Sequence, residues 1–328
     1  MTGFGPESLR IDEAAETERI SERIRAYMRR TRRKGAVVAV SGGIDSSVVA
    51  ALCVHALGAD RVFAIQMPEA ESADETLDIS SELIRSLGVD STYENISPML
   101  EAFGCYRRRD DAIRRIFPEF GPGYLSKIVL PSVIDSDSYR IYSVVIQTPD
   151  GTQQTRRLST SAYLEIVAAT NFKQRTRKTL EYFHADRLNY FVTGTPNRLE
   201  YDQGFFVKLG DGSADLKPIA HLYKSQVYAL AAHLGVPESI RTRPPTTDTY
   251  SLPQSQEEFY FSLPYDRMDL CLYGLNNNVP VGEIAEALGL TEEQVGRVFR
   301  DIEQKRRTTA YLHEPPVLVG EVAEIGHA

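Results

Sequence analysis

The sequence predicts an α/β protein, a doubly wound parallel sheet with a small inserted lobe. The sheet is predicted because short apolar strands alternate with helices from residue 8 to residue 95. Parallel strands joined by crossover helices require this order. The lobe is predicted because the alternation then stops, and residues 106–158, rich in Arg, Pro and Gly, take its place.

The first part of the chain is assigned from the spacing of its apolar residues. Residues 8–33 carry apolar side chains at helical spacing, and Gly35 ends this helix. The strands expected next are Val37–Val40, Arg61–Met67 and Asp90–Asn95, and the helices between them are Ser46–Leu57 and Asp74–Leu87. Gly58 and Gly88 follow these two helices directly, where a glycine suits the C-cap.

The remaining elements follow from turn residues and periodicity. Tyr139–Gln147 and Gln153–Leu158 are strand-like and flank the turn tripeptide Pro149-Asp150-Gly151, which predicts a hairpin. The elements expected after it are a helix at 160–184, a strand at Asn189–Thr193, a helix at Tyr223–Leu234, a long loop at 241–264 and two helices within 280–306. The predicted domains are therefore a core of residues 1–105 and 159–279, the insertion 106–158, and a C-terminal helical segment and tail, 280–328.

Composition favours a cytoplasmic enzyme with neither a membrane nor a nucleic acid as partner. No apolar run approaches the roughly 18 residues of a membrane helix, and the N-terminus lacks the features of a secretory signal. The three cysteines are scattered and odd in number, which argues against a disulfide scaffold or a zinc site. The net charge of 37 − 45 = −8 disfavours a general nucleic-acid binder.

The strongest chemical signal is the segment SGGIDSS at residues 41–47, between a predicted strand and a predicted helix. Its glycines allow backbone N–H groups to approach a phosphate, and the helix N-terminus adds further donors. Asp45 in such a loop suits a Mg²⁺ ion that bridges phosphates. Neither a Walker A lysine nor the G-x-G-x-x-G fingerprint is present. The predicted phosphate-binding residues are Ser41, Gly42, Gly43, Asp45, Ser46 and Ser47.

Two further positions point to ligands on general grounds. Asn171 and Arg175 are four residues apart on a predicted helix, so they share a face that can present an amide and a guanidinium to one ligand. A solvated basic helix face is the alternative interpretation. Thr195 closes a predicted strand, at the end where ligands bind in open α/β sheets.

These segments together resemble the ammonia-dependent NAD synthetases, a family of N-type ATP pyrophosphatases. The loop at 41–47 resembles their pyrophosphate loop, and NFKQRTR at 171–177 resembles their Asn-x-x-Ala-Arg-x-Arg segment. GTPNRLEYDQGFFVKLGDGSADLKP at 194–218 resembles a third family stretch. The resemblance covers residues 36–100 and 160–310. It implies a Rossmann-like fold of the adenine nucleotide alpha hydrolase type.

The resemblance also implies roles for individual residues. Asp45 and Glu200 would hold Mg²⁺, and Asp45, Lys208 and Arg175 would serve catalysis. The residues implied to bind ATP or pyrophosphate beyond the loop are Thr195, Lys208 and Lys224, and those implied to bind the acceptor are Asn171, Arg175, Asp215, Thr246 and Lys305. For Lys224 and Lys305, a charged helix end without a ligand is the alternative.

The implied reaction is the ATP-dependent amidation of deamido-NAD⁺ to NAD⁺ by ammonia. An adenylated carboxylate forms, and AMP and pyrophosphate are released. The core begins near residue 36, which leaves no room for the amidohydrolase domain of glutamine-dependent members. Free ammonia, or ammonia from a separate glutaminase, is therefore implied. The resemblance also implies a homodimer.

Other functions remain open at this stage. The insertion at 106–158, together with Glu257, Tyr260, Phe261 and Ser262 in the segment that covers the site in the family, departs from the family pattern. These departures favour a ligase of the same fold that adenylates another carboxylate. A tRNA thiolase is disfavoured because catalytic cysteines and a basic surface are absent from the sequence. A DNA-binding regulator using 280–306 is disfavoured by the acidic charge and by the presence of Asp45 and Glu200.

Overall fold

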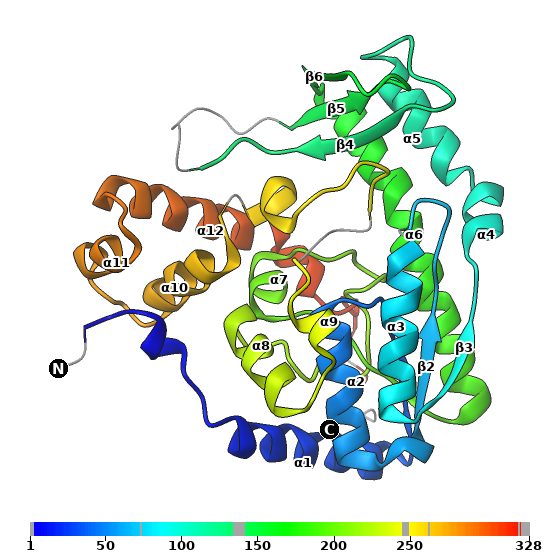
Figure 1. Ribbon diagram of the computed structural model, residues 1–328, viewed down its shortest axis with the longest axis vertical. Helices are drawn as coiled ribbons and strands as arrows, with labels where there is room; N and C mark the ends of the chain where they lie inside the picture. Colours follow the sequence, from blue (N-terminus) through cyan, green and yellow to red (C-terminus); the bar gives the residue numbers. More distant parts are fainter. Residues whose placement is uncertain are drawn as a thin grey trace.

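A parallel sheet forms the centre of the molecule. The structure is a computed structural model that describes residues 3–72, 74–133, 142–244, 249–261, 263–320 and 322. Within them, four parallel strands are ordered β3-β2-β1-β7. Figure 1 shows β2 and β3 of this sheet side by side. Their bounds are β1 (Ala36–Ala39), β2 (Val62–Gln66), β3 (Asp90–Tyr93) and β7 (Phe191–Val192). The predicted doubly wound α/β fold is confirmed.

Helices cover both faces of this sheet. Val38 of β1 packs into a cluster with Val48 and Leu52, while its neighbour Val37 packs on the other face with Ala185. Successive strand residues point to opposite faces, so both are buried and β1 is apolar throughout. The first face is covered by α1 (Glu13–Thr31), α2 (Ile44–Leu57), α3 (Asp74–Leu87), α8 (Lys224–His233) and α9 (Glu238–Arg241), and the second by α4 (Ser97–Ala102), α5 (Cys105–Arg114) and α6 (Thr160–Leu188).

The inserted lobe is a second, antiparallel sheet at one end of α6. Its strands are β4 (Leu125–Val129), β5 (Ser143–Gln147) and β6 (Gln153–Arg157), in the order β4-β5-β6. The predicted hairpin is confirmed by β5 and β6, which pair from Gln147 with Gln153. Strand β4 was not predicted. Because Phe117, Ile128, Ile146 and Ile166 share one buried cluster, the lobe packs on α5 and on the first turns of α6.

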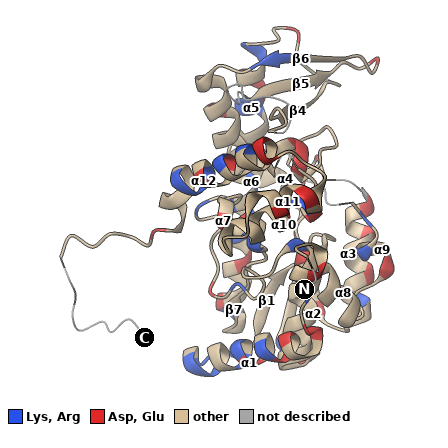
Figure 2. Ribbon diagram, turned by 90° about the vertical axis from the view of Figure 1, so that its left-hand side faces the viewer, with Lys and Arg blue, Asp and Glu red and all other residues tan. Residues whose placement is uncertain are grey.

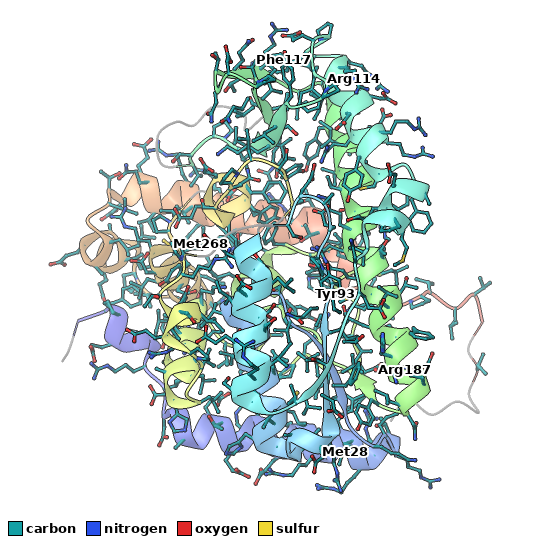
Figure 3. All side chains as sticks on the ribbon, turned by 45° about the vertical axis from the view of Figure 1, so that its right-hand side comes forward. Met28, Tyr93, Arg114, Phe117, Arg187 and Met268 are labelled. Carbon is teal, nitrogen blue, oxygen red and sulfur yellow. The ribbon has the colours of Figure 1, made fainter. Side chains whose placement is uncertain are left out.

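Helix α6 connects the lobe to the sheet. It has 29 residues and continues four residues beyond the predicted end at 184. Figure 3 shows Phe117 within the lobe and Arg187 at the opposite end of α6, where its guanidinium lies 4.9 Å from the ring centroid of Phe63 on β2. One rigid helix therefore contacts both sheets.

The C-terminal helices form a cluster of their own. They are α10 (Tyr265–Asn276), α11 (Val281–Leu288) and α12 (Glu292–His313), with α7 (Arg198–Gln203) beside them. Ile284 and Val298, from the two helices predicted at 280–306, are buried against Met268. Their apolar faces are thus covered by α10, as in ordinary packed helices. Beyond α12, residues 314–320 are exposed and extend away from the domain (Figure 2).

The remaining short elements lie at the N-terminus and in the predicted loop. They are the 3₁₀ helices η1 (Pro6–Leu9) and η2 (Ala59–Arg61) and the π-helical turn η3 (Glu257–Phe261). The last of these corrects the prediction of an irregular loop over 241–264. The three cysteines are free and buried. In the described part of the chain, every helix is too short or too polar to cross a membrane.

A buried ionic cluster fastens the lobe to the core. Lys173 of α6 is 1% exposed, and its ammonium lies 2.8 Å from Glu69, 2.7 Å from Glu71 and 2.9 Å from the carbonyl oxygen of Thr249. Arg109 of α5 also pairs with Glu71, at 2.5 Å. Burial alone would raise the pKa of Glu71, but Lys173 and Arg109 together hold it below its ordinary value. Glu71 is therefore held in its ionised form and is compensated by basic side chains from two helices.

We expect Lys173→Met to lower the free energy of unfolding by about 3–5 kcal/mol, because it removes the cation that pairs with the buried Glu69 and one of the two that pair with Glu71. Denaturant titration measures this change. The matched control is Lys34→Met at an exposed lysine, expected to stay within about 0.5 kcal/mol of the unsubstituted protein. Equal effects of the two substitutions would contradict the role assigned to the cluster.

Candidate active site

A cavity of about 420 Å³ opens at the carboxyl ends of the parallel strands. Its walls include residues 39–41, 43, 45 and 46 after β1, residues 65–68 at the end of β2, and residues 193, 195 and 196 after β7. Ligands bind at this edge in open α/β sheets. The cavity also runs along α6 toward the lobe, where Tyr142 and Tyr163 line it.

The segment 41–47 forms a compact loop at the start of α2. Gly42 has φ 75°, in the left-handed region that favours glycine, and a Cβ there would lie 3.0 Å from the carbonyl oxygen of Thr76. The hydroxyls of Ser46 and Ser47 donate to the carbonyl oxygen of Gly43 at 3.0 and 2.8 Å. Ser41, Gly43, Asp45 and Ser46 line the cavity, whereas Ser47 is fully buried beneath it.

Two carboxylates meet beside this loop. The side chain of Asn197 connects Asp45 to the backbone of Glu200, because its amide donates to the Asp45 carboxylate at 3.1 Å and its oxygen accepts the backbone N–H of Glu200 at 3.2 Å. The Glu200 carboxylate in turn accepts from the backbone N–H of Asn197 at 3.1 Å and from Gln256 at 3.0 Å. Asp45 and Glu200, 155 positions apart in the chain, are thus brought to one wall.

A buried lysine completes this cluster. The ammonium of Lys224, at the start of α8, pairs with Asp45. Burial alone would lower the pKa of Lys224, but Asp45 and Glu200 raise it above its ordinary value. Burial and the nearby charge of Asp45 raise the pKa of Glu200 to about 8. Two carboxylates therefore share one lysine, and a further cation would allow Glu200 to ionise at neutral pH.

The cluster fits a magnesium ion better than a metal held by protein alone. Within the described residues, no group of three or more His, Cys, Asp or Glu side chains has the arrangement of a metal cage. Mg²⁺ in nucleotide sites usually takes one or two carboxylates and completes its shell with phosphate oxygens and water. Asp45 and Glu200, next to a phosphate-type loop, have this composition.

Helix α6 contributes one continuous wall. Its cavity-lining residues recur at helical spacing and are Tyr163, Val167, Thr170, Asn171, Lys173, Gln174, Arg177, Lys178 and Glu181. Lys178 and Glu181 form a buried pair, with 2.6 Å between nitrogen and oxygen, that the sequence did not reveal. A lysine and a glutamate three residues apart on a helix are usually solvated, so spacing alone could not identify this pair.

Several predicted residues lie outside the cavity wall. Arg175 is exposed, and its guanidinium donates to the carbonyl oxygen of Lys208 at 3.3 Å. The ammonium of Lys208 donates to the carbonyl oxygens of Tyr311 and Glu314 at the end of α12. These carbonyls have no partner within the helix, so a nearby lysine binds them.

Two other predicted residues are occupied by structural contacts. The carboxylate of Asp215 accepts the backbone N–H of Val192 at 2.8 Å and so holds the end of β7. Lys305 is buried, pairs with Asp301 and donates to the carbonyl oxygen of Tyr260 at 2.7 Å. Thr246 lies outside the described residues. Thr195 and Asn171 line the cavity.

The sequence also gave no sign of an aromatic wall. Phe205 stacks on Tyr260 with 4.7 Å between ring centroids, and both line the cavity. Tyr142 stacks on Tyr163 at 4.3 Å farther along α6. These rings come from four separate segments, so only the folded chain brings them together.

Comparison with known proteins gives a consistent picture. A sequence model of the NAD synthase family matches residues 16–115 and 132–313. A relative from Rhizobium meliloti, named NH(3)-dependent NAD(+) synthetase, is 59% identical over 98% of this chain and 96% of its own length. A relative of the same name from Thermotoga maritima is 37% identical over 79% of this chain and 85% of its own length.

A solved structure agrees in fold. The NH3-dependent NAD synthetase from Campylobacter jejuni, in complex with the nitrate ion, has a TM-score of 0.61 and 23% identity, covering 94% of this chain and 100% of that one. At this identity the likeness shows the fold alone, the predicted adenine nucleotide alpha hydrolase type. Between its two matched segments, the family model leaves residues 116–131 of this chain unmatched, and these residues fall within the insertion.

We expect Gly42→Ala to cost about 1–2 kcal/mol of unfolding free energy, because a side chain is strained at this φ, and to weaken ATP binding by displacing the loop. Denaturant titration and equilibrium binding of ATP measure the two effects. Gly43→Ala is the matched control, since φ is −82° there and the new Cβ would lie 3.4 Å from the Ser41 hydroxyl. A larger effect at Gly43 on stability would contradict the argument.

Proposed function

This chain belongs to the NAD synthase family, and from that premise we propose which of its residues bind ATP, metal and acceptor. The reaction is the ATP-dependent amidation of deamido-NAD⁺ to NAD⁺ with ammonia, through an adenylated carboxylate. Relatives at 54–59% identity share this name, so another carboxylate is not retained as the acceptor. The observation that carries the residue assignment is the meeting of Asp45 and Glu200 beside the loop at 41–47.

ATP would lie across the carboxyl ends of β1 and β2. Its phosphates would bind to the loop from Ser41 to Ser47, where the first backbone N–H groups of α2 have no acceptor within the helix. Its adenosine would lie between β2 and α3, where Met67, Leu77 and Ser80 line the cavity. Both placements follow the general rule for this fold class.

Asp45 and Glu200 would hold Mg²⁺. The ion would neutralise charge on the ATP phosphates during attack at the α-phosphorus. Lys224 would keep Asp45 in place and add a fixed positive charge to the same wall. Two converging carboxylates with a single shared lysine support this assignment.

The chain's own work in the reaction is positioning. A carboxylate oxygen of the acceptor attacks the α-phosphorus, pyrophosphate leaves, and ammonia then displaces AMP from the acyl adenylate. No side-chain nucleophile is required, and binding the two substrates in line supplies most of the acceleration. Asn171 and Thr195 are placed to contact the acceptor or the nucleotide directly.

Other predicted residues would contribute through movement or support. Arg175 and Lys208 are linked to each other, so both would reach the phosphates only if the end of α12 released Lys208. Asp215 and Lys305 would act as positioning residues, the first for β7 and the second for Tyr260 of the cavity wall. Thr246 is retained as an acceptor-binding residue on the resemblance alone.

A homodimer would use the outer face of α6. Phe103 and Phe183 are 50% and 57% exposed, and Phe103 stacks on Phe172. Phe172 and Phe183 are about three helical turns apart and share a face. Exposed apolar side chains grouped in this way are typical of an interaction surface. A cytoplasmic location, and a separate glutaminase as one source of ammonia, stay predictions.

We expect Asp45→Asn and Glu200→Gln each to reduce the release of AMP and pyrophosphate by at least about 100-fold, because each removes a charge that stabilises the transition state. The assay contains ATP, Mg²⁺, ammonium and deamido-NAD⁺. Asp186→Asn, at an exposed carboxylate, is the matched control and should keep full activity. Full activity of Glu200→Gln at low Mg²⁺ would refute the metal assignment.

We expect the double substitution Phe103→Asp, Phe183→Asp to shift the protein from dimer to monomer in sedimentation velocity, because charges replace the apolar contacts of the interface. Val319→Asp, on the exposed tail, should leave the sedimentation coefficient unchanged. A monomer before any substitution, or a dimer that survives the double change, would rule out this interface.

A further inference from the structure

We propose that Gln256 is a positioning residue for the carboxylate of Glu200, and that strand β4 of the inserted lobe holds Gln256 in place. The proposal rests on the magnesium site proposed above, because it concerns how one of the two carboxylates of that site is oriented. It gives the insertion a part in the reaction through a side chain of the core.

Every carboxylate oxygen of Asp45 and Glu200 accepts a hydrogen bond. The amide of Asn197 donates to one oxygen of Asp45, and the ammonium of Lys224 donates to the other. One oxygen of Glu200 accepts the backbone N–H of Asn197, and the other accepts the amide of Gln256 at 3.0 Å. A carboxylate oxygen has two lone pairs, so these bonds orient both groups and leave each oxygen able to bind a cation.

Gln256 differs from the other donor to Glu200 in its distance along the chain. Asn197 is the N-cap of α7 and Glu200 is its third residue, so their reciprocal bonds form within one capping box. Gln256 is 56 positions from Glu200 and directly precedes η3. Its contact with Glu200 therefore depends on what holds the segment 249–261 against the core.

Strand β4 bonds to this segment on both sides of Gln256. The backbone N–H of Leu252 donates to the carbonyl oxygen of Ser126 at 3.1 Å. The backbone N–H of Leu130, directly after β4, donates to the carbonyl oxygen of Glu258 at 3.0 Å. In Figure 1 the segment, drawn in yellow, lies below β4. The backbone that carries Gln256 is thus fixed to the lobe before and after this residue.

A lysine of β4 adds a charged contact. The ammonium of Lys127 lies 2.9 Å from the carboxylate of Glu258 and donates to the carbonyl oxygen of Pro253 at 3.2 Å. Strand β4 lies within residues 116–131, which the family model leaves unmatched between its two matched segments. The part of the chain that holds Gln256 is therefore a feature of the insertion.

The bond from Gln256 bears on metal binding because a carboxylate that loses a hydrogen-bond donor is free to turn. Removing a group that orients a metal-binding side chain typically weakens metal binding about 10–100-fold. A glutamine that only stabilised the fold would lack this selectivity. The two roles are separated by measuring nucleotide binding with and without the metal.

The test measures binding to the full-length protein without turnover. The ligand is α,β-methylene-ATP, whose α–β link is not cleaved, and calorimetry gives its Kd with saturating Mg²⁺ and again with EDTA. We expect Gln256→Met, which keeps the length of the side chain and removes the donor, to raise the Kd with Mg²⁺ about tenfold or more. The Kd with EDTA should stay within about twofold. Gln304→Met, at an exposed glutamine of α12, is the matched control and should change neither value.

A second variant tests the part played by β4. Lys127 is not among the residues that line the cavity, so Lys127→Met acts on the site only through the segment it holds. We expect it to raise the Kd with Mg²⁺ about threefold, the scale of one partly exposed ion pair. Combined with Gln256→Met it should add no further loss, because both changes act through the same bond. Lys127→Arg, which keeps the charge, should bind as the unsubstituted protein does.

The outcomes distinguish this inference from the metal site on which it rests. Glu200→Gln should abolish the tightening of binding by Mg²⁺, and if it does not, the metal assignment itself is wrong. If Glu200→Gln abolishes the tightening and Gln256→Met keeps it, Gln256 does not position Glu200. Equal losses with Mg²⁺ and with EDTA would assign Gln256 to the nucleotide or to folding. Independent, additive losses from Lys127→Met and Gln256→Met would remove β4 from the proposal.

Discussion

The architecture depends on the burial of Lys173. Its ammonium has three acceptors, Glu69, Glu71 and the carbonyl oxygen of Thr249, and they belong to two segments far apart in the chain. A buried carboxylate without a partner is costly, so the segment after β2 has to lie against α6. Arg109 brings α5 and the lobe to the same point. One charge cluster thus joins the segment after β2, α5, α6 and the segment of Thr249.

The active-site cluster differs from the Lys173 cluster in its balance of carboxylates and basic side chains. At Lys173, two carboxylates are matched by two basic side chains, and the pKa of Glu71 is lowered. Beside the phosphate loop, Asp45 and Glu200 share only Lys224, and the pKa of Glu200 rises to about 8. The first cluster is complete in the folded chain. The second has two carboxylates and one basic side chain, which agrees with the magnesium site proposed for it.

Helix α6 extends from the lobe along the cavity that contains the active-site cluster, and it carries Lys173 of the other cluster. It also forms most of one cavity wall, and its first turns pack against the antiparallel sheet. Loops in α/β proteins usually vary without affecting the core. Here the insertion bonds to the segment of Tyr250 and supplies Tyr142 to the cavity, so it is joined to the site.

The sequence by itself determined the features that depend on local spacing. The strands and helices of the sheet, the hairpin of β5 and β6, and the loop at 41–47 follow from periodicity, turn residues and glycine positions. Glu200 was predicted as a second magnesium ligand only from the family resemblance. In the structure, Asp45 and Glu200 line the same cavity. Tertiary structure alone decided which charged residues face the cavity. Lys208 and Lys305 bind backbone carbonyls outside it, and Lys178 pairs with Glu181 inside it. The reason is physical: a lysine takes whichever acceptors the fold brings within about 3 Å, and spacing along the chain does not reveal them.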